Sequence, residues 1–319
     1  MTVYDDPLLN DIAERLGSDD PGIRRIAVLD LVDSGEPEAI DLLSLALRDP
    51  DINVRREAAK VVDEFDATEM ANALLKALSD EDELVRNAAA NALADLKDPA
   101  AATPLLRVLA ESTDPFVVAG VLRALKPLRI PAAADAASNH LDAPDPRVRR
   151  EAIGVLGYLR EENSLPALIA LARGDLDAEV RRAAVGTLLF GSPETVAETL
   201  IAALGDEHWQ VRCEAANSIG KMRLKAGTDP LIQSTRDHLW QVRERAVEAL
   251  GKLSAVKAIP CLGLCSRDDV SNLRKAAVAA LGQIGHADGR PFVEEALQDP
   301  DPDVRKLARW AQERLRSIA

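Results

Sequence analysis

The sequence predicts an all-α fold, an α-solenoid of about ten stacked helical hairpins, and three observations support this. A short pattern recurs along nearly the whole chain, and its apolar positions have the spacing of one face of a helix. Hydrophobic residues make up 47% of the 319 residues, whereas aromatic residues make up only 3%. The small aliphatic residues that dominate such a composition suit helices that pack closely.

The repeat is clearest at a recurring arginine, which we call the ladder position and from which we number the other positions of each copy. Successive ladder positions are 31 residues apart, or 32 in two cases. Position +3 is alanine in every copy but one, and position +7 is apolar in every copy but the last. Apolar residues at −1, +3, +4 and +7 predict the first helix of each hairpin. The ladder residues are Arg24, Arg55, Arg86, Val118, Arg149, Arg181, Arg212, Arg243, Arg274 and Arg305.

A second apolar segment follows in each copy, for example over 102–109, 164–171 and 256–264. It often carries proline in its first turn, where the missing amide hydrogen needs no partner. One hairpin cannot bury its own apolar face, so neighbouring copies must stack. We expect one continuous array over residues 1–319: an N-terminal capping helix within 1–17, repeats of about 31 residues over 18–303, and a C-terminal capping helix over 304–319.

An aspartate usually precedes the ladder arginine by four residues, where its side chain can cap the first helix. We expect the arginine of one copy to reach the acidic turn of its neighbour, which makes this pattern structural. Copy four departs from it, with Val118 at the ladder position and extra prolines at Pro127 and Pro131. This departure predicts a kink or a change of curvature over 112–140, and a ligand site there stays open. The capping aspartates are Asp20, Asp51, Asp82, Asp114, Asp145, Asp177 and Asp301.

The block from Asp206 through Val211 and Arg212 to Ile219 and Gly220 resembles the HEAT-like repeats first named for phycobilisome lyase subunits (the PBS lyase type). The resemblance covers nearly the whole chain and implies an α-solenoid. Proteins with such repeats include bilin-attachment subunits, an iron-dependent deoxyhypusine hydroxylase and many scaffolds. The hydroxylase uses recurring His-Glu pairs as iron ligands, and none of the four histidines here is followed by glutamate. We therefore exclude that activity.

The charge and composition favour a cytoplasmic protein. The formal net charge is −14, so neither nucleic acid nor an anionic membrane is an expected partner. No apolar stretch is long enough to cross a bilayer, and the first residues do not form a signal peptide. Three cysteines do not make a disulfide framework. We expect a monomer that binds another protein.

Two tryptophans mark the best candidate for a binding surface. Trp209 and Trp240 both stand at position −3, where other copies have Pro or another smaller residue. The block His208-Trp209-Gln210 is echoed by His238-Leu239-Trp240-Gln241, and Cys213 lies one helical turn beyond Trp209. Tryptophan is enriched in binding hot spots, so these residues form a candidate partner-binding patch. The alternative is that each ring only covers the end of its own repeat.

The cysteines offer two weaker hypotheses. Cys261 and Cys265 are spaced to share one helical face, and zinc would need two more ligands, for which Cys213, His208 and His238 are candidates. However, both align with core leucines of another copy, which favours buried free thiols and no metal or other cofactor. Cys213 stands at position +1, which is usually polar, so the pattern predicts an exposed thiol that Arg212 could make reactive.

No Gly-rich phosphate loop, Ser/His/Asp set or carboxylate pair is evident in the sequence. The favoured function is therefore a non-catalytic scaffold or adaptor that presents an extended surface to a cytoplasmic protein. The alternative is a subunit of a bilin lyase or isomerase, or another factor that inserts a cofactor into a partner, which rests on the resemblance alone. A site built by the second helices on a concave face also stays open.

Overall fold

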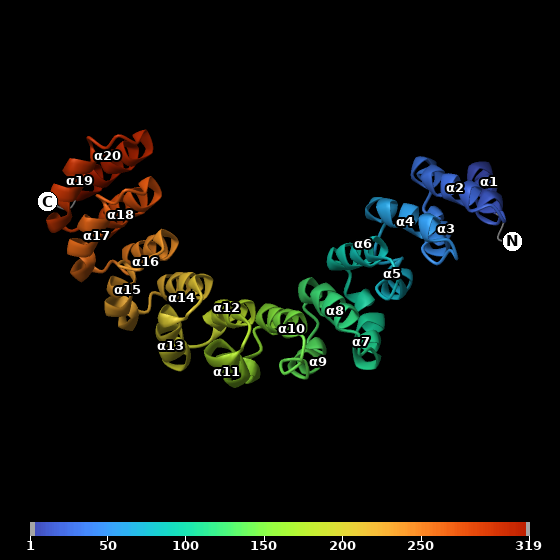
Figure 1. Ribbon diagram of the computed structural model, residues 1–319, viewed down its shortest axis with the longest axis horizontal. Helices are drawn as coiled ribbons and strands as arrows, with labels where there is room; N and C mark the ends of the chain where they lie inside the picture. Colours follow the sequence, from blue (N-terminus) through green and yellow to red (C-terminus); the bar gives the residue numbers. More distant parts are fainter. Residues whose placement is uncertain (1–3, 317–319) are drawn as a thin grey trace. The chain divides into compact units, whose positions relative to one another are not determined.

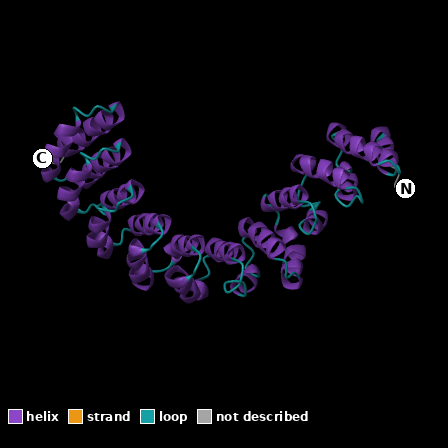
Figure 2. Cartoon of the chain, viewed as in Figure 1, coloured by secondary structure: helices purple, strands orange, loops and turns teal. Residues whose placement is uncertain are grey.

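The computed structural model describes residues 4–316, and within this range the chain contains helices and no strand (Figure 2). This confirms the predicted all-α class. The ten first helices are α2 (Pro21–Ser34), α4 (Ile52–Val61), α6 (Glu83–Ala94), α8 (Pro115–Leu128), α10 (Pro146–Leu159), α12 (Ala178–Thr187), α14 (Trp209–Met222), α16 (Trp240–Lys252), α18 (Ser271–Ile284) and α20 (Pro302–Arg316). The second helices are α3 (Ala39–Ala46), α5 (Ala71–Ala77), α7 (Ala102–Glu111), α9 (Ala133–Ser138), α11 (Leu165–Gly174), α13 (Pro193–Ala202), α15 (Thr228–Ser234), α17 (Ile259–Cys265) and α19 (Arg290–Ala296).

The chain divides into two compact units, residues 1–161 and 162–319. In each unit the first helices pack side by side in one layer and the second helices form the other layer (Figure 1). Helix α1 (Pro7–Leu16) lies before the first hairpin, in the region predicted as a cap. Within each unit the first helices lie on the inner side of the bend (Figure 1).

The repeat pattern defines the core of both units. Position +3 is buried in all ten copies, and position +7 is buried in every copy that has an apolar residue there. Small residues let the first helices approach closely. A Cβ atom added at Gly220 would lie 2.9 Å from the Cα of Ala249, and one at Gly251 would lie 3.0 Å from the Cα of Ala280. These glycines therefore allow α14, α16 and α18 to pack backbone against backbone.

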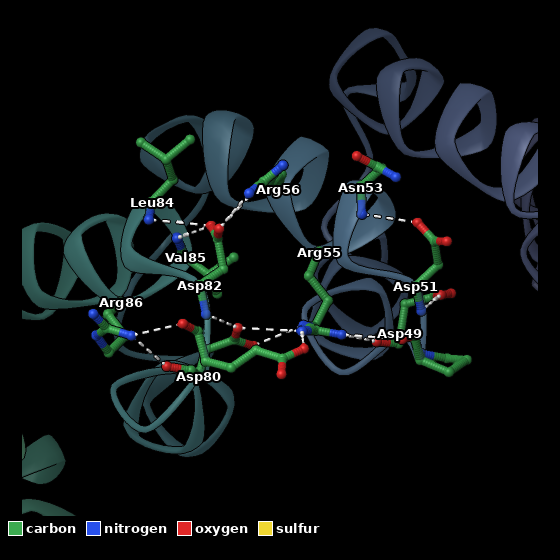
Figure 3. A network of polar contacts seen from close by, with 12 residues as sticks. Asp49, Asp51, Asn53, Arg55, Arg56, Asp80, Asp82, Leu84, Val85 and Arg86 are labelled. Carbon is green, nitrogen blue, oxygen red and sulfur yellow. Dashed lines mark hydrogen bonds and ion pairs between the residues drawn. The ribbon is translucent and has the colours of Figure 1, made fainter.

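The ladder arginines join neighbouring copies, as Arg55 illustrates (Figure 3). Its Nε donates to Asp80 of the next acidic turn at 2.7 Å, and its Nη1 donates to the carbonyl oxygens of Asp49 and Pro50 at 2.9 and 3.2 Å. One guanidinium thus ties the turn before its own helix to the turn of the following copy. The same ion pair occurs in Arg24–Asp49, Arg181–Asp206, Arg212–Asp237, Arg243–Asp268 and Arg274–Asp299.

The predicted capping aspartates are confirmed, since each accepts a hydrogen bond from a backbone N–H in the first turn of its helix. Such a cap stabilises a helix by about 1 kcal/mol. Copy four keeps its cap, Asp114, although its ladder arginine is replaced by the buried Val118.

Copy four, where a kink or a change of curvature is predicted over 112–140, has a first helix that forms a single element. Helix α8 runs without interruption over 14 residues, and Pro127 falls in its last turn. A proline near the end of a helix removes few intrahelical hydrogen bonds, and the helix ends at Leu128, followed by Arg129 with a φ of 51°. Among residues 4–316, no helix combines the length and apolarity needed to cross a membrane.

Candidate protein-binding groove

An open groove of about 490 Å³ lies on the first helices α12, α14 and α16 of the second unit. We call it the tryptophan groove. Its lining residues stand at positions −3, −2, +1, +2 and +5 of their copies, which share one side of the first helices. They are Arg182, Trp209, Gln210, Cys213, Glu214, Asn217, Trp240, Gln241, Glu244 and Arg245. Five of the seven residues predicted for the binding patch are therefore brought together here.

The two tryptophans are the first residues of α14 and α16. Their side chains are half-buried, and both rings line the same groove. This arrangement arises because one repeat step carries position −3 of one copy to the equivalent place on the next helix. Each ring thus keeps part of its apolar surface open to a ligand.

The two histidines do not line the groove, contrary to the prediction. His208 immediately precedes α14, and its Nδ1 is buried without a hydrogen-bond partner. His238 is exposed, and its Nδ1 lies 3.3 Å from Oδ1 of Asp237, a ladder carboxylate. Both histidines belong to the turns that lead into the helices, and they stand at different positions, −4 and −5. The patch therefore contains two rings, two amides and one thiol, but no imidazole.

The interpretation of Cys213 as an exposed reactive thiol is wrong. The residue is half-buried, and burial raises the pKa of its thiol to about 11. Arg212, which was expected to favour the thiolate, donates instead to Asp237 at 2.8 Å. The thiol is thus neutral near pH 7 and forms part of the groove wall.

The other two cysteines are core residues, as their alignment with leucines predicts. Cys261 and Cys265 are buried and free, and the thiol of Cys261 donates to the carbonyl oxygen of Ala258 at 3.0 Å. Burial raises the pKa of Cys265 to about 12. Across the described range 4–316, no group of three His, Cys, Asp or Glu side chains is placed to hold a metal ion.

Sequence reasoning missed the charged residues of the groove. Arg182 pairs with Glu179 at 2.6 Å, and Arg245 pairs with Glu248 at 2.8 Å. Burial raises the pKa of Glu244, and the neighbouring charge of Glu248 raises it further. These side chains looked like ordinary solvated surface, although positions +1 and +2 share a side of the helix with position −2.

The lining of the groove combines apolar and polar recognition without a net charge. Two arginines and two glutamates flank the rings, and Gln210, Gln241 and Asn217 supply amides. Oε1 of Gln241 is buried and has no hydrogen-bond partner. An unsatisfied buried acceptor costs free energy of about 1–3 kcal/mol, which a bound segment would offset only after the side chain turned to expose the oxygen.

Comparison with known proteins places the chain in a family. A family profile described as HEAT repeats matches residues 41–126, 130–197, 197–276 and 264–317. None of the curated protein sequences compared with the chain matches it.

Three solved structures are similar to the chain. An engineered protein is 21% identical, with 98% of this chain and 99% of that chain covered and a TM-score of 0.53. YibA of Escherichia coli is 18% identical, with 81% and 95% covered and a TM-score of 0.63. Kap95, solved in complex with Nup1, is 15% identical, with 97% of this chain but 50% of Kap95 covered and a TM-score of 0.62. These identities bear on the fold alone, and with the matched repeats they show that the chain belongs to the HEAT-repeat family.

Proposed function

We propose that this protein is a non-catalytic scaffold or adaptor, and that the tryptophan groove is where it binds a partner protein. The observation that carries the proposal is the convergence of Trp209 and Trp240, from two copies, on one open groove. Tryptophan rings that retain exposed apolar area next to fixed polar groups are typical of binding hot spots.

The chemistry of the groove indicates what kind of segment would fit. The two rings suit two apolar side chains of a ligand that are separated by the spacing of adjacent first helices. The equal numbers of arginines and glutamates suit a segment that carries both positive and negative side chains. Carboxylates of Glu214 and Glu244 accept hydrogen bonds, and so does Oε1 of Gln241 if its side chain turns toward the groove. We therefore expect a peptide segment with apolar anchors and free backbone N–H groups.

The helix ends at the groove also support a role other than stability. Helices α14 and α16 begin without a side-chain cap, whereas α2 to α12 in the first-helix layer all begin with a capping aspartate. The absence of a capping aspartate costs about 1 kcal/mol of stability per helix. The next helix, α18, also lacks a cap. Departures from a stabilising pattern are expected where function takes precedence.

The structural neighbours support the class of function. Kap95, a protein of similar fold, was solved bound to the protein Nup1. A solenoid surface is suited to such contacts because it presents many side chains from regularly spaced helices.

The test begins by trapping the partner at the groove. A photo-crosslinking residue placed at Gln210 should capture a protein from native lysate that the same residue at Arg236 does not. Arg236 is exposed in the turn after α15 and does not line the groove. A captured protein can then be purified and titrated against the variants.

Replacing Trp209 and Trp240 together with alanine should weaken binding of that protein by about 2 kcal/mol per ring, with little change in melting temperature. Trp310→Ala is the matched control, because Trp310 is the third tryptophan and lies in α20 outside the groove. An unaltered affinity would contradict the proposal. So would a loss of stability, derived from the melting temperature, that is as large in kcal/mol as the loss of binding free energy.

A finer proposal concerns the type of repeat. The resemblance of residues 206–220 to the PBS lyase type makes a role as a bilin lyase subunit, or another cofactor-insertion factor, the alternative function. Adding a bilin to the purified protein tests it. A shifted visible absorption band would favour the alternative, and an unchanged spectrum would favour the adaptor.

We further propose that the protein acts as a cytoplasmic monomer and binds neither nucleic acid nor membranes. The support is its net charge of −14, which opposes binding to polyanions. A mobility-shift assay with duplex DNA at low salt tests the first exclusion, and a bound fraction would contradict it.

A further inference from the structure

A second groove lies on the first helices of the other unit, formed by α6, α8 and α10, with a volume of about 180 Å³. Nearly all of its lining residues stand at positions that also line the tryptophan groove, namely −2, +1, +2 and +5. Phe116 and Arg147 stand at −2, Asn87 and Arg150 at +1, and Arg123 at +5. We call it the arginine groove.

The lining carries a positive charge in an otherwise acidic chain. Three arginines and one carboxylate, Glu151, face this groove, whereas the whole chain has a net charge of −14. The carboxylate of Glu151 forms an ion pair with Lys126, whose Nζ lies 2.5 Å from Oε2. Nη2 of Arg150 lies 3.7 Å from Oε1 of the same carboxylate. The local excess of guanidinium groups is therefore not neutralised by the neighbouring carboxylate.

Arg123 makes this excess available to a ligand. It is exposed on α8, and no hydrogen bond or ion pair to it is found among residues 4–316. Arg147 is different, because its Nη2 lies 2.7 Å from Asp145, the cap of α10. Arg150 lies 3.7 Å from Glu151, beyond hydrogen-bond distance, so Arg123 and Arg150 both keep N–H donors that an anion can bind.

The departure of copy four from the repeat pattern shapes the groove. Positions +1 and +2 of this copy are Ala119 and Gly120, whereas every other copy has a larger side chain in at least one of these two positions. Their small side chains leave space between the guanidinium groups. The ring of Phe116 forms part of the wall, and the guanidinium of Arg86 stacks over it at 5.6 Å.

We propose that the arginine groove binds an acidic side chain of a peptide segment. The planar fork of arginine matches a carboxylate, and two such groups on neighbouring helices can hold one anion between them. The amides of Asn87 and Asn91 add donors at the rim. The volume suits one side chain, and a nucleic acid would bring many phosphates against an acidic chain. This inference does not depend on the tryptophan groove.

The test is direct binding of a fluorescein-labelled hexapeptide of alternating Glu and Gly, followed by anisotropy at low salt. The double variant R123Q/R150Q should weaken binding about tenfold, the equivalent of about 1.4 kcal/mol. The control variant K76Q/R107Q removes two exposed cations from the second helices α5 and α7 of the same unit. It should bind within about twofold of wild type, which would separate a defined site from general charge.

Three results would overturn the proposal. They are no binding to the wild-type protein, equal weakening in both double variants, and binding of a single-stranded oligonucleotide that exceeds peptide binding and is lost in R123Q/R150Q. Melting temperatures check folding. Arg147 is left intact in these variants because it contacts the capping Asp145. A tryptophan-groove variant, W209A/W240A, should bind the acidic peptide normally, so this test and that of the adaptor function fail separately.

Discussion

The two grooves occupy equivalent positions of the same repeat and yet differ in chemistry. One is neutral and presents Trp209 and Trp240, and the other is basic and presents Arg123 and Arg150 around a phenylalanine. Beneath both, positions +3 and +7 are buried alike and the first helices pack in the same way. The comparison shows that the repeat separates two sets of positions. One set holds the hairpins together, and the other is free to acquire recognition chemistry.

This separation has an energetic meaning. Positions of the first set bury apolar area or ion pairs between helices, so their substitution should change the free energy of unfolding in either unit. Positions of the second set should change binding and leave stability almost unaltered. Each prediction below tests which set a residue belongs to.

The largest effect is expected at position +3. Ala89 and Ala215 are 1% and 0% exposed in the first and second unit. Glutamate at either would place an unpaired charge between packed helices and should cost several kcal/mol, on the order of 4. Lys306→Glu, at an exposed position of α20, is the control and should be nearly neutral. Chemical denaturation measures all three, and equal stability of either alanine variant and the control would refute the assigned register.

The next largest effect is expected in the ladder. The side chains of Arg212 and Asp237 are 9% and 12% exposed and form a two-bond ion pair. Arg212→Leu would leave the Asp237 carboxylate buried without its partner, at a cost of about 3 kcal/mol. Arg236→Leu, at the exposed turn, should cost much less. Equal melting temperatures of the two variants would show that the ladder ion pair does not stabilise the stacked hairpins.

A smaller and opposite pair of effects is expected for glycines of the first helices. In Gly251→Ala the new Cβ would meet the backbone of Ala280 at 3.0 Å, so α16 and α18 must separate, at a cost of about 2 kcal/mol. In Gly154→Ala it would meet the side chain of Lys126, which can move away. Higher helix propensity should then stabilise that variant by a few tenths of a kcal/mol. Thermal melts that rank the two variants the other way round would contradict this account.

The smallest effect concerns the thiol in the tryptophan groove. Because burial raises the pKa of Cys213 to about 11, its thiolate fraction at pH 8 should be about a hundredfold below that of a group with the ordinary value of 9.0. Alkylation by iodoacetamide should therefore be slow at pH 8 and accelerate with pH up to about 11. Rapid labelling at pH 8, absent in Cys213→Ser, would show instead an exposed and activated thiol.

Most of the fold could be predicted because its determinants are local. The spacing of Ala215 and Ile219 from Arg212 defines a helix face within two turns, and the same spacing recurs in every copy. The ladder could be predicted as well, since the arginine and its aspartate partner are a constant distance apart in sequence. The division into two units could not, because it depends on how tightly consecutive copies pack.

The site could be predicted only where residues break the pattern. Trp209 and Trp240 stood out because their position usually holds a smaller residue, and the groove contains both. Arg182 and Glu244 did not stand out, because charged residues at their position are usual. The histidines were wrongly assigned to the groove because they precede the first residues of α14 and α16. A difference of one residue at the start of a helix places a side chain in the turn and not on the helix face. The arginine groove was anticipated only as a region, because copy four departs from the pattern over 112–140, whereas Arg123 and Arg150 did not stand out since polar residues are common at their positions.

One measurement tests the central claim, that the tryptophan groove is a binding surface and that its rings do not serve only to hold the hairpins together. Trp310→Phe leaves Trp209 and Trp240 as the only tryptophans in the chain. Acrylamide quenching of their emission can then be followed as the crosslinked partner, purified, is added. We predict that quenching falls by at least half at saturation and that the emission maximum moves to shorter wavelength, because both rings lose contact with water. Quenching and emission that stay unchanged while the partner binds would contradict the claim.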